Sequence, residues 1–177
     1  MRITVYLGSN EGKNPVYAEA AKKLGTFIGT SGLGLVYGGS NVGLMGILAG
    51  AALESGAEVI GVEPRFFVES VPQLPGLSEL IVTPDMQTRK KKLIELGDAF
   101  IAFPGGTGTL EEISEVISSS SIGIMEKPYV FYSLGGYYQD LERFFDHAAA
   151  EGFIAEEKRR NIRFASSLGE IREALGL

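Results

Sequence analysis

The sequence predicts an α/β protein with three layers, built on a doubly wound and mainly parallel sheet of about seven strands. Short apolar runs alternate with helix-length segments along the whole chain, which is typical of repeated strand-helix-strand units. The apolar runs are nearly continuous, as expected for strands that are buried on both faces. Glycine supplies 24 of 177 residues, about twice its usual share of about 7%, and it collects where apolar runs end.

The strands are expected at runs rich in β-branched, aromatic and aliphatic residues. In chain order these runs are Ile3–Leu7, Leu35–Tyr37, Glu58–Val62, Glu79–Thr83, Ala99–Phe103, Pro128–Tyr132 and Ile162–Ala165.

Helix-length segments lie between these strands, and right-handed crossovers would place them on both faces of the sheet. They are Val16–Thr30, the small-residue segment Gly43–Ser55, Met86–Leu96, Leu110–Ile122, Tyr137–Glu151 and a terminal helix. The one irregular loop is Gln73–Leu77, which is flanked and interrupted by prolines. Because no linker or repeat divides the chain, residues 1–177 are expected to form a single nucleotide-binding domain.

Composition excludes several classes of function. A formal charge of −6 argues against a nucleic-acid partner. There is no cysteine, which excludes thiolate chemistry. The single histidine, His147, leaves almost no residues from which a Ser-His-Asp triad or a multi-histidine metal site could be built. Neither a signal-peptide core nor a membrane-length apolar run is present. We therefore expect a cytoplasmic protein with no membrane partner, no metal and no cofactor.

In a doubly wound sheet, ligands bind beyond the carboxyl ends of the strands, and three glycine-bearing segments follow strands here. Gly8–Asn14 is one residue shorter than a P-loop and has asparagine where serine or threonine belongs. Gly38–Gly46 does not match the dinucleotide-binding pattern G-x-G-x-x-G. Glu63 lies near the distance expected for an acidic residue that binds the ribose, but without matching glycines it does not make this segment a dinucleotide-binding site. Glycines for tight helix–sheet packing remain a competing interpretation of Gly38–Gly46.

The strongest segment is Phe103–Glu112, which ends a strand and opens a helix. Its three glycines let a ligand approach the backbone, while Thr107 and Thr109 are expected to supply hydroxyls and helix capping. A helix N-terminus favours a bound anion, so we predict a phosphate site; the competing interpretation is an ordinary capped turn. Asp85–Lys92 is a basic run in an acidic chain. It is a further candidate for the site, and the competing interpretation of this run is an ordinary solvated helix face.

Taken together, these segments resemble the cytokinin-activating phosphoribohydrolase family, called LOG and long mislabelled as lysine decarboxylases. The family signature P-G-G-x-G-T-x-x-E is intact from Pro104 to Glu112. The similarity implies a Rossmann-like version of the doubly wound fold and a homodimer, for which the apolar segments around Phe66-Phe67 and Gly43–Ala52 are candidate interfaces. Further matches are Gly8-Ser9, Tyr37-Gly38-Gly39, Gly43–Gly46, Arg89-Lys90, Lys127-Pro128, Gly136-Tyr137-Tyr138, Asp146–Ala148 and Glu151–Ile154.

The resemblance implies hydrolysis of the N-glycosidic bond of a nucleoside 5′-monophosphate, a cytokinin ribotide or an AMP-like nucleotide, to free base and ribose 5-phosphate. It makes Arg89 and Glu112 the catalytic pair. These residue types suit the chemistry, because cleavage of a glycoside builds positive charge on the sugar that a carboxylate can stabilise. The residues expected to bind the substrate are Gly8, Ser9, Gly39, Ser40, Met86, Lys90, Gly105, Gly106, Thr107, Gly108, Thr109 and Glu115.

Positions at which this sequence differs from the family leave the identity of the substrate's base undetermined. The family commonly has histidine at Gln87, and tryptophan and glutamine at Ser119 and Ser121, where we expect serines to reshape the wall around the base. An alternative function is a non-catalytic carrier or binding protein for another phosphorylated small molecule, such as molybdenum cofactor; a weaker one is a nucleotide sensor. Retention of both Arg89 and Glu112 favours the enzyme.

Overall fold

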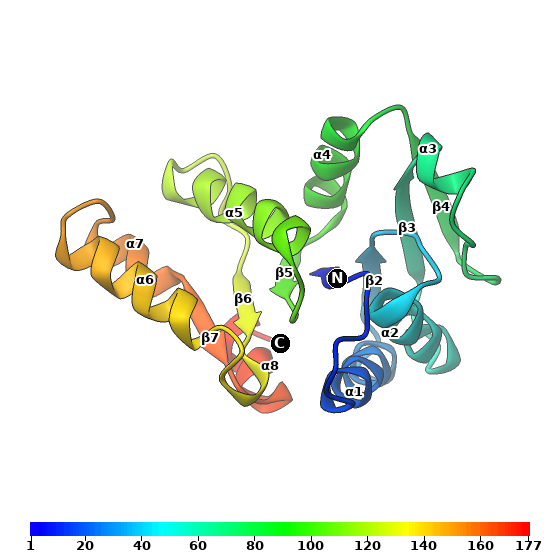
Figure 1. Ribbon diagram of the computed structural model, residues 1–177, viewed down its shortest axis with the longest axis horizontal. Helices are drawn as coiled ribbons and strands as arrows, with labels where there is room; N and C mark the ends of the chain where they lie inside the picture. Colours follow the sequence, from blue (N-terminus) through cyan, green and yellow to red (C-terminus); the bar gives the residue numbers. More distant parts are fainter.

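Seven strands form one sheet in the computed structural model, which describes residues 1–177 (Figure 1). The sheet order is β4-β3-β2-β1-β5-β6-β7, and all neighbouring strands are parallel. The expected mainly parallel sheet of about seven strands is therefore confirmed, and it is wholly parallel. The strands are β1 (Arg2–Tyr6), β2 (Gly34–Tyr37), β3 (Val59–Pro64), β4 (Glu79–Thr83), β5 (Ala99–Ala102), β6 (Tyr129–Tyr132) and β7 (Arg163–Ala165).

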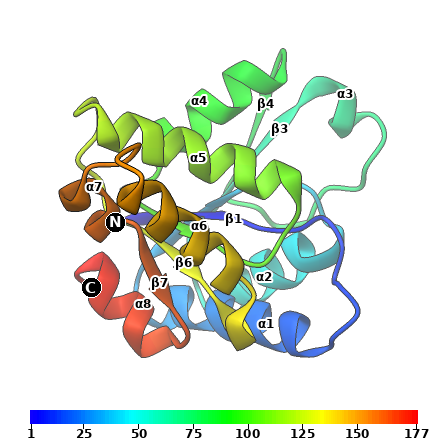
Figure 2. The same ribbon diagram turned by 60° about the vertical axis from the view of Figure 1, so that its left-hand side comes forward.

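Eight α-helices and one 3-10 turn connect and flank the strands (Figure 2). The sequence does not predict two short helices, α3 and α7, because four and six residues are too few for a helical periodicity to be recognised. None of the helices is long and apolar enough to cross a bilayer. The helices are α1 (Val16–Thr30), α2 (Gly43–Glu54), α3 (Arg65–Val68), α4 (Met86–Leu96), α5 (Thr107–Ser121), α6 (Gln139–Ala150), α7 (Glu156–Asn161) and α8 (Leu168–Leu175), and the turn η1 is Leu134–Gly136.

The two faces of the sheet carry separate cores, which makes the fold three-layered as expected. On one face α1, α2 and α8 bury residues such as Leu24, Leu48 and Ile171. On the other face α4 and α5 bury Leu93 and Ile113 against the sheet, and α6 adds partly buried side chains there. Because β1, β2, β3, β5 and β6 are covered on both sides, their residues are almost all buried, which explains their continuous apolar pattern.

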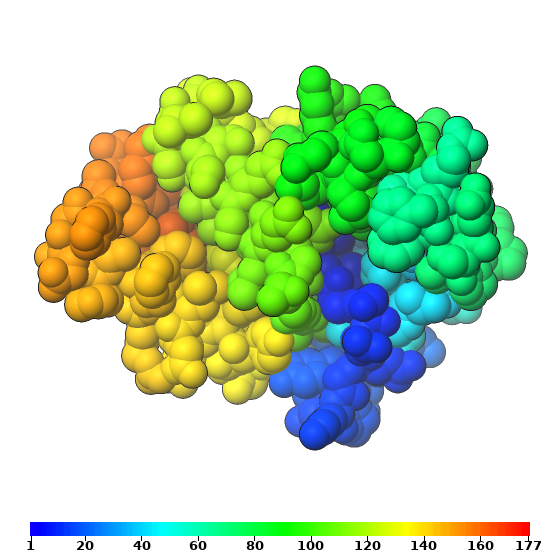
Figure 3. Space-filling view, turned by 45° about the horizontal axis from the view of Figure 1, so that its top comes forward, coloured from blue at the N-terminus to red at the C-terminus, as the bar shows by residue number.

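The order of the strands reverses between β1 and β5. The chain runs from β1 outward to β4 on one side, and β5 then returns to the other side of β1. Such a switch point leaves a crevice at the carboxyl ends of the strands. In the space-filling view the segment after β1 (blue) lies at the surface between the start of α5 (green) and the segment after β2 (cyan) (Figure 3).

Lys127, just before β6, caps the carboxyl end of α4. Its Nζ donates to the carbonyl oxygens of Ile94 at 3.0 Å and of Gly97 at 2.7 Å. Those carbonyls have no partner within the helix, and a charged donor suits the negative end of the helix dipole.

We therefore expect Lys127→Met to lower the free energy of unfolding by about 2 kcal/mol. The matched control is Lys92→Met, which removes an exposed pair with Glu95 and should cost less than about 0.5 kcal/mol. Urea denaturation measures both; equal losses from the two variants would contradict this role for Lys127.

Candidate active site

An open cleft of about 480 Å³ lies at the switch point, beyond the carboxyl ends of β1, β2 and β5. The structure brings most of the expected site residues together there, from segments that are far apart in the chain. Those that line the cleft are Gly8, Ser9, Ser40, Met86, Arg89, Gly105, Gly106, Thr107, Gly108, Thr109 and Glu112.

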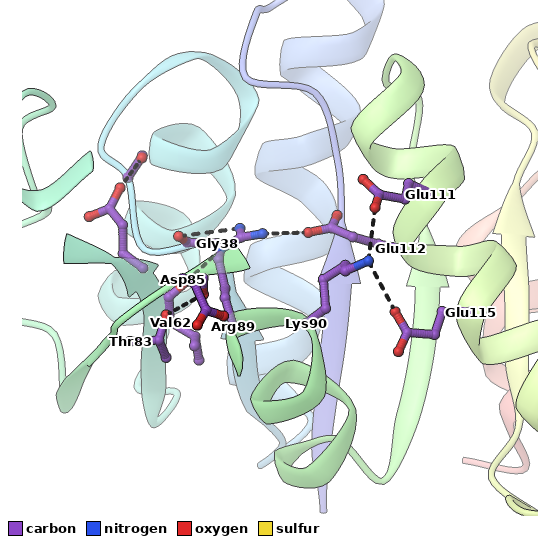
Figure 4. A network of polar contacts seen from close by, with 11 residues as sticks. Gly38, Val62, Thr83, Asp85, Arg89, Lys90, Glu111, Glu112 and Glu115 are labelled. Carbon is purple, nitrogen blue, oxygen red and sulfur yellow. Dashed lines mark hydrogen bonds and ion pairs between the residues drawn. The ribbon is translucent and has the colours of Figure 1, made fainter. Parts of the chain in front are cut away.

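The centre of the cleft is an ion pair between α4 and α5. Arg89 Nη1 donates to Glu112 Oε1 at 2.6 Å, and the two side chains are only 11% and 12% exposed. Arg89 Nε donates to the carbonyl oxygen of Val62 at 2.9 Å, and Nη2 lies 3.5 Å from that of Gly38 (Figure 4). The guanidinium is thus held by β3, by the end of β2 and by α5, which fixes the direction in which it presents Glu112.

Burial and charge act in opposite directions on Glu112. Burial raises the pKa of this carboxyl above its ordinary value, and the Arg89 guanidinium opposes that rise without cancelling it. A carboxyl whose pKa is shifted towards neutrality, in a cleft and beside a cation, is the arrangement that acid–base and electrostatic catalysis require.

Lys90 does not line the cleft although it follows Arg89 directly. Its Nζ donates to Glu111 Oε1 at 2.8 Å and lies 3.5 Å from Glu115 Oε2 (Figure 4). The lysine is 8% exposed, and neither it nor Glu115 lines the cleft. The pairs join α4 to α5 beside the Arg89–Glu112 contact, so this structure places both residues in support of that contact.

Gly39 also lies behind the wall of the cleft. Its φ is +95°, and a Cβ at this position would come within 2.8 Å of the Cβ of Glu63 on β3. The side chain of Tyr37 donates to the Gly39 carbonyl at 2.9 Å. Only glycine fits this conformation and spacing, so Gly39 shapes the segment from which its neighbours Gly38 and Ser40 line the cleft.

The glycine loop after β5 leaves a helix N-terminus open to the cleft. A Cβ on Gly105 would collide with Thr109 Oγ1 and lie 2.8 Å from the backbone nitrogen of Gly8, whereas Gly106 and Gly108 have open space around them. Gly106 is the N-cap of α5, and no side chain caps the helix. The expectation that Thr107 and Thr109 cap it is therefore wrong: the helix begins at Thr107, so both threonines lie within its first turn.

The contrast with α4 makes the open end of α5 significant. At the start of α4, Asp85 accepts from the Thr88 backbone N–H at 2.7 Å and satisfies one free donor of the helix. At α5 the first N–H groups have no side-chain acceptor, and the residues that carry them, Thr107, Gly108 and Thr109, line the cleft. Free donors at the positive end of a helix bind anions.

Two tyrosines join the site without having been predicted as members of it. Tyr137 donates from its hydroxyl to the Gly105 carbonyl at 2.7 Å, and its ring meets that of Tyr17 edge-on, with centroids 5.7 Å apart. Both tyrosines line the cleft. Tyr138 donates to the carbonyl of Phe103 at 2.7 Å. The match of Gly136-Tyr137-Tyr138 to the family was the available signal, but spacing alone does not bring it to the glycine loop.

The serines of α5 lie elsewhere. Ser119 and Ser121 do not line the cleft, since they follow Glu112 by about two helical turns or more. In this chain by itself they contribute nothing to the walls of the cleft, and the expectation that they reshape the wall around the base stays a prediction. Gln87 is exposed and also outside the cleft. Apolar walls are instead contributed by Leu44, Met45, Phe67 and Met86. No group of three or more His, Cys, Asp or Glu side chains is arranged to hold a metal ion.

Comparison with known proteins identifies close sequence relatives. A family profile described as "Possible lysine decarboxylase" matches residues 45–175. A cytokinin riboside 5′-monophosphate phosphoribohydrolase of Rhodococcoides fascians is 46% identical over 162 residues, which cover 90% of this chain and 81% of that protein. A protein of the same name from Arabidopsis thaliana is 42% identical over 170 residues, covering 96% of this chain and 78% of the relative.

Solved structures share the fold at lower identity. A molybdenum cofactor carrier protein from Chlamydomonas reinhardtii superposes with a TM-score of 0.75 at 22% identity, covering 99% of this chain and 98% of that one. A molybdenum cofactor binding protein from Rippkaea orientalis gives 0.70 at 24% identity, covering 97% and 93%. These likenesses establish the Rossmann-like fold, and the sequence relatives establish the family: the chain belongs to the LOG family, whose profile carries the lysine decarboxylase description.

Proposed function

We propose that this protein is a nucleoside 5′-monophosphate phosphoribohydrolase, which cleaves the N-glycosidic bond of a cytokinin ribotide or an AMP-like nucleotide. The observation that carries the proposal is the buried Arg89–Glu112 pair in the same cleft as the open N-terminus of α5. The Glu112 carboxylate of the pair suits a sugar that develops positive charge, and the open N-terminus of α5 suits a phosphate. The names of relatives more than 40% identical support the same activity.

In the proposed reaction the 5′-phosphate binds to the N–H groups of the Gly105–Thr109 loop. Its binding energy then holds the ribose beside Glu112. The bond from C1′ to the base nitrogen breaks, and the sugar becomes oxocarbenium-like. The Glu112 carboxylate stabilises this charge. A water oxygen forms the new bond to C1′, and a proton from that water ends on the departing base. The products are the free base and ribose 5-phosphate.

Arg89 acts in this scheme by orienting Glu112. Its Nε and Nη2 are directed at backbone carbonyls and its Nη1 at the carboxylate, so these contacts fix the guanidinium and, with it, the position of the Glu112 carboxylate. The positive charge of Arg89 also limits the rise that burial causes in the pKa of the Glu112 carboxyl, which favours the ionised form that a charge-stabilising role uses.

The carrier alternative draws no separate support from the solved structures, since likeness at 22–24% identity extends to the fold alone. A carrier would need the glycine loop but not a buried Arg–Glu pair beside it. Homodimer formation and a cytoplasmic location stay predictions. The proposed chemistry depends on neither, because every group it uses comes from one chain.

The function is tested by incubating the purified protein with AMP, an N6-isopentenyl AMP and the other common ribonucleoside 5′-monophosphates. Ribose 5-phosphate release is followed for each. We expect release from at least one adenine nucleotide, and a rate for adenosine lower by at least about 100-fold, because the nucleoside lacks the phosphate handle. No release from any nucleotide that nevertheless binds tightly would refute the proposal.

A further inference from the structure

Glu63 is a fully buried acidic residue that the proposed mechanism does not use. It lies on β3, is 0% exposed, and takes part in none of the ion pairs of the chain. Its two oxygens each accept a hydrogen bond from a neutral side chain. Ser40 donates from Oγ to Oε1, and Gln73 donates from Nε2 to Oε2 at 3.1 Å. A buried carboxyl group with such partners determines which atoms around it donate and which accept.

Ser40 connects this buried carboxyl group to the cleft. The serine is 6% exposed and lines the cleft, and its segment is fastened to the loop after α3 by a bridge to Gln73 and by the Asn41 N–H donating to the Pro72 carbonyl at 2.8 Å. A hydroxyl has one hydrogen and two lone pairs. Since the hydrogen is directed at Glu63, only lone pairs remain for a ligand, so Ser40 presents an acceptor to the cleft.

The position of Ser40 indicates which part of a nucleotide it meets. The phosphate loop follows β5 and Ser40 follows β2, with β1 between these strands. A nucleotide anchored by its phosphate at α5, with its ribose beside Glu112, therefore extends its base towards Ser40. The cleft walls on that side include Met45, whose Sδ lies against Gly38, and Phe67 on α3. Apolar and aromatic side chains of this kind suit a flat base.

We infer that Ser40, held by Glu63, is a specificity-determining acceptor that selects a base carrying an exocyclic N–H donor. This inference rests on the proposed function. The adenine class qualifies, including N6-substituted adenines, which retain one N–H. Hypoxanthine is rejected because its oxo group would set an acceptor against the lone pairs of Ser40 and leave both without a hydrogen. Glu63 is a positioning residue, since it acts on the ligand only through Ser40.

Replacing Glu63 with glutamine should reverse the selection. Gln73 Nε2 is surrounded by acceptors, among them the Val71 carbonyl, so it remains a donor. The new amide at position 63 must then turn its oxygen to Gln73 and its NH₂ group to Ser40. Ser40 accepts from that NH₂ group, and its own hydrogen becomes free to point into the cleft. The acceptor becomes a donor with almost no change in shape.

The test compares AMP with IMP, both as kcat/KM and as binding affinity on a Glu112→Gln background, where turnover is not needed. The wild-type protein should prefer AMP by at least about 10-fold, a difference that one hydrogen bond supplies. Glu63→Gln should invert or abolish this preference. Ser40→Ala, which removes the acceptor, should bring the ratio close to one even if Glu63→Gln fails to fold. Phosphate affinity should stay within about 3-fold throughout.

Two results would overturn the inference. One is an AMP to IMP ratio near one in the wild-type protein, or a ratio that Ser40→Ala leaves unchanged. The other is that Ser40→Ala alters discrimination between AMP and 2′-deoxy-AMP instead, which would assign Ser40 to the sugar. Because the binding measurement does not depend on turnover, absence of ribose 5-phosphate release would count against the proposed function and leave the selection by Ser40 to be judged by affinity.

Discussion

Glu112→Gln is expected to lower kcat for a cleaved nucleotide by about 10³-fold, with the affinity for that nucleotide changed by less than about 3-fold. Glutamine keeps an oxygen that accepts from Arg89 Nη1, so the geometry of the 2.6 Å contact survives. What it lacks is the negative charge that stabilises the oxocarbenium-like sugar. Steady-state kinetics and calorimetric binding separate the two effects.

The matched control is Glu142→Gln, because Glu142 also pairs with an arginine, Arg159, at 3.6 Å but lies on α6 outside the cleft. Its kcat should equal that of the wild-type protein. If Glu112→Gln instead lost affinity while retaining kcat, Glu112 would hold the ground state of the substrate and the mechanism above would be wrong.

The raised pKa of Glu112 adds a pH dependence to this prediction. Because burial raises that pKa, the acidic limb of kcat/KM should lie above the ordinary range of a glutamate. The same shift acts on stability. Where the folded protein binds the proton and the unfolded chain does not, stability falls as the pH rises through the folded-state pKa. Glu112→Gln lacks this loss, so its stability relative to wild type should increase from acidic to neutral pH in urea denaturation.

Gly105→Ala should lower kcat/KM at least about 100-fold, since displacement of a positioning loop by as little as 1 Å has effects of that size. The added methyl group would meet Thr109 Oγ1 and the backbone nitrogen of Gly8. The Gly8 backbone is hydrogen-bonded to the Pro104 carbonyl at 3.2 Å and has no rotamer to adopt. The loop must therefore shift at the point where we place the phosphate, and affinity for inorganic phosphate should fall in parallel.

Gly169→Ala is the control, because Gly169 lies in α8 outside the cleft, is exposed, and an added Cβ there would meet only Ser167 Oγ, at 3.9 Å. Alanine favours a helix over glycine by about 1 kcal/mol, so this variant should be as active as wild type and slightly more stable. Unchanged kinetics in Gly105→Ala would show that the loop is not the phosphate site.

The fold followed closely from periodicity, because buried parallel strands and crossover helices leave strong patterns. The bounds of α1, β4 and α4 agree with those expected from sequence. The start of α5 differed, since the helix begins at Thr107. A glycine N-cap looks like loop in sequence, so propensity placed the helix start too late.

The site was only partly predictable. The glycine loop, Arg89 and Glu112 lie in recognisable motifs, and their meeting follows from the switch point. The roles of Lys90 and Tyr137 depend on where side chains point after packing: adjacent residues Arg89 and Lys90 face different partners. In the sequence Glu63 stands out only by its distance from a glycine segment, whereas its contact with Ser40 depends on how the segment after β2 lies against β3.

The most direct test of the central claim is a single-turnover experiment with the protein in excess over AMP, followed by analysis of all products. A phosphoribohydrolase should consume the AMP and form adenine and ribose 5-phosphate in equal amounts, while Glu112→Gln returns AMP intact and bound. Recovery of intact, tightly bound AMP from the wild-type protein would show instead that the protein is a carrier.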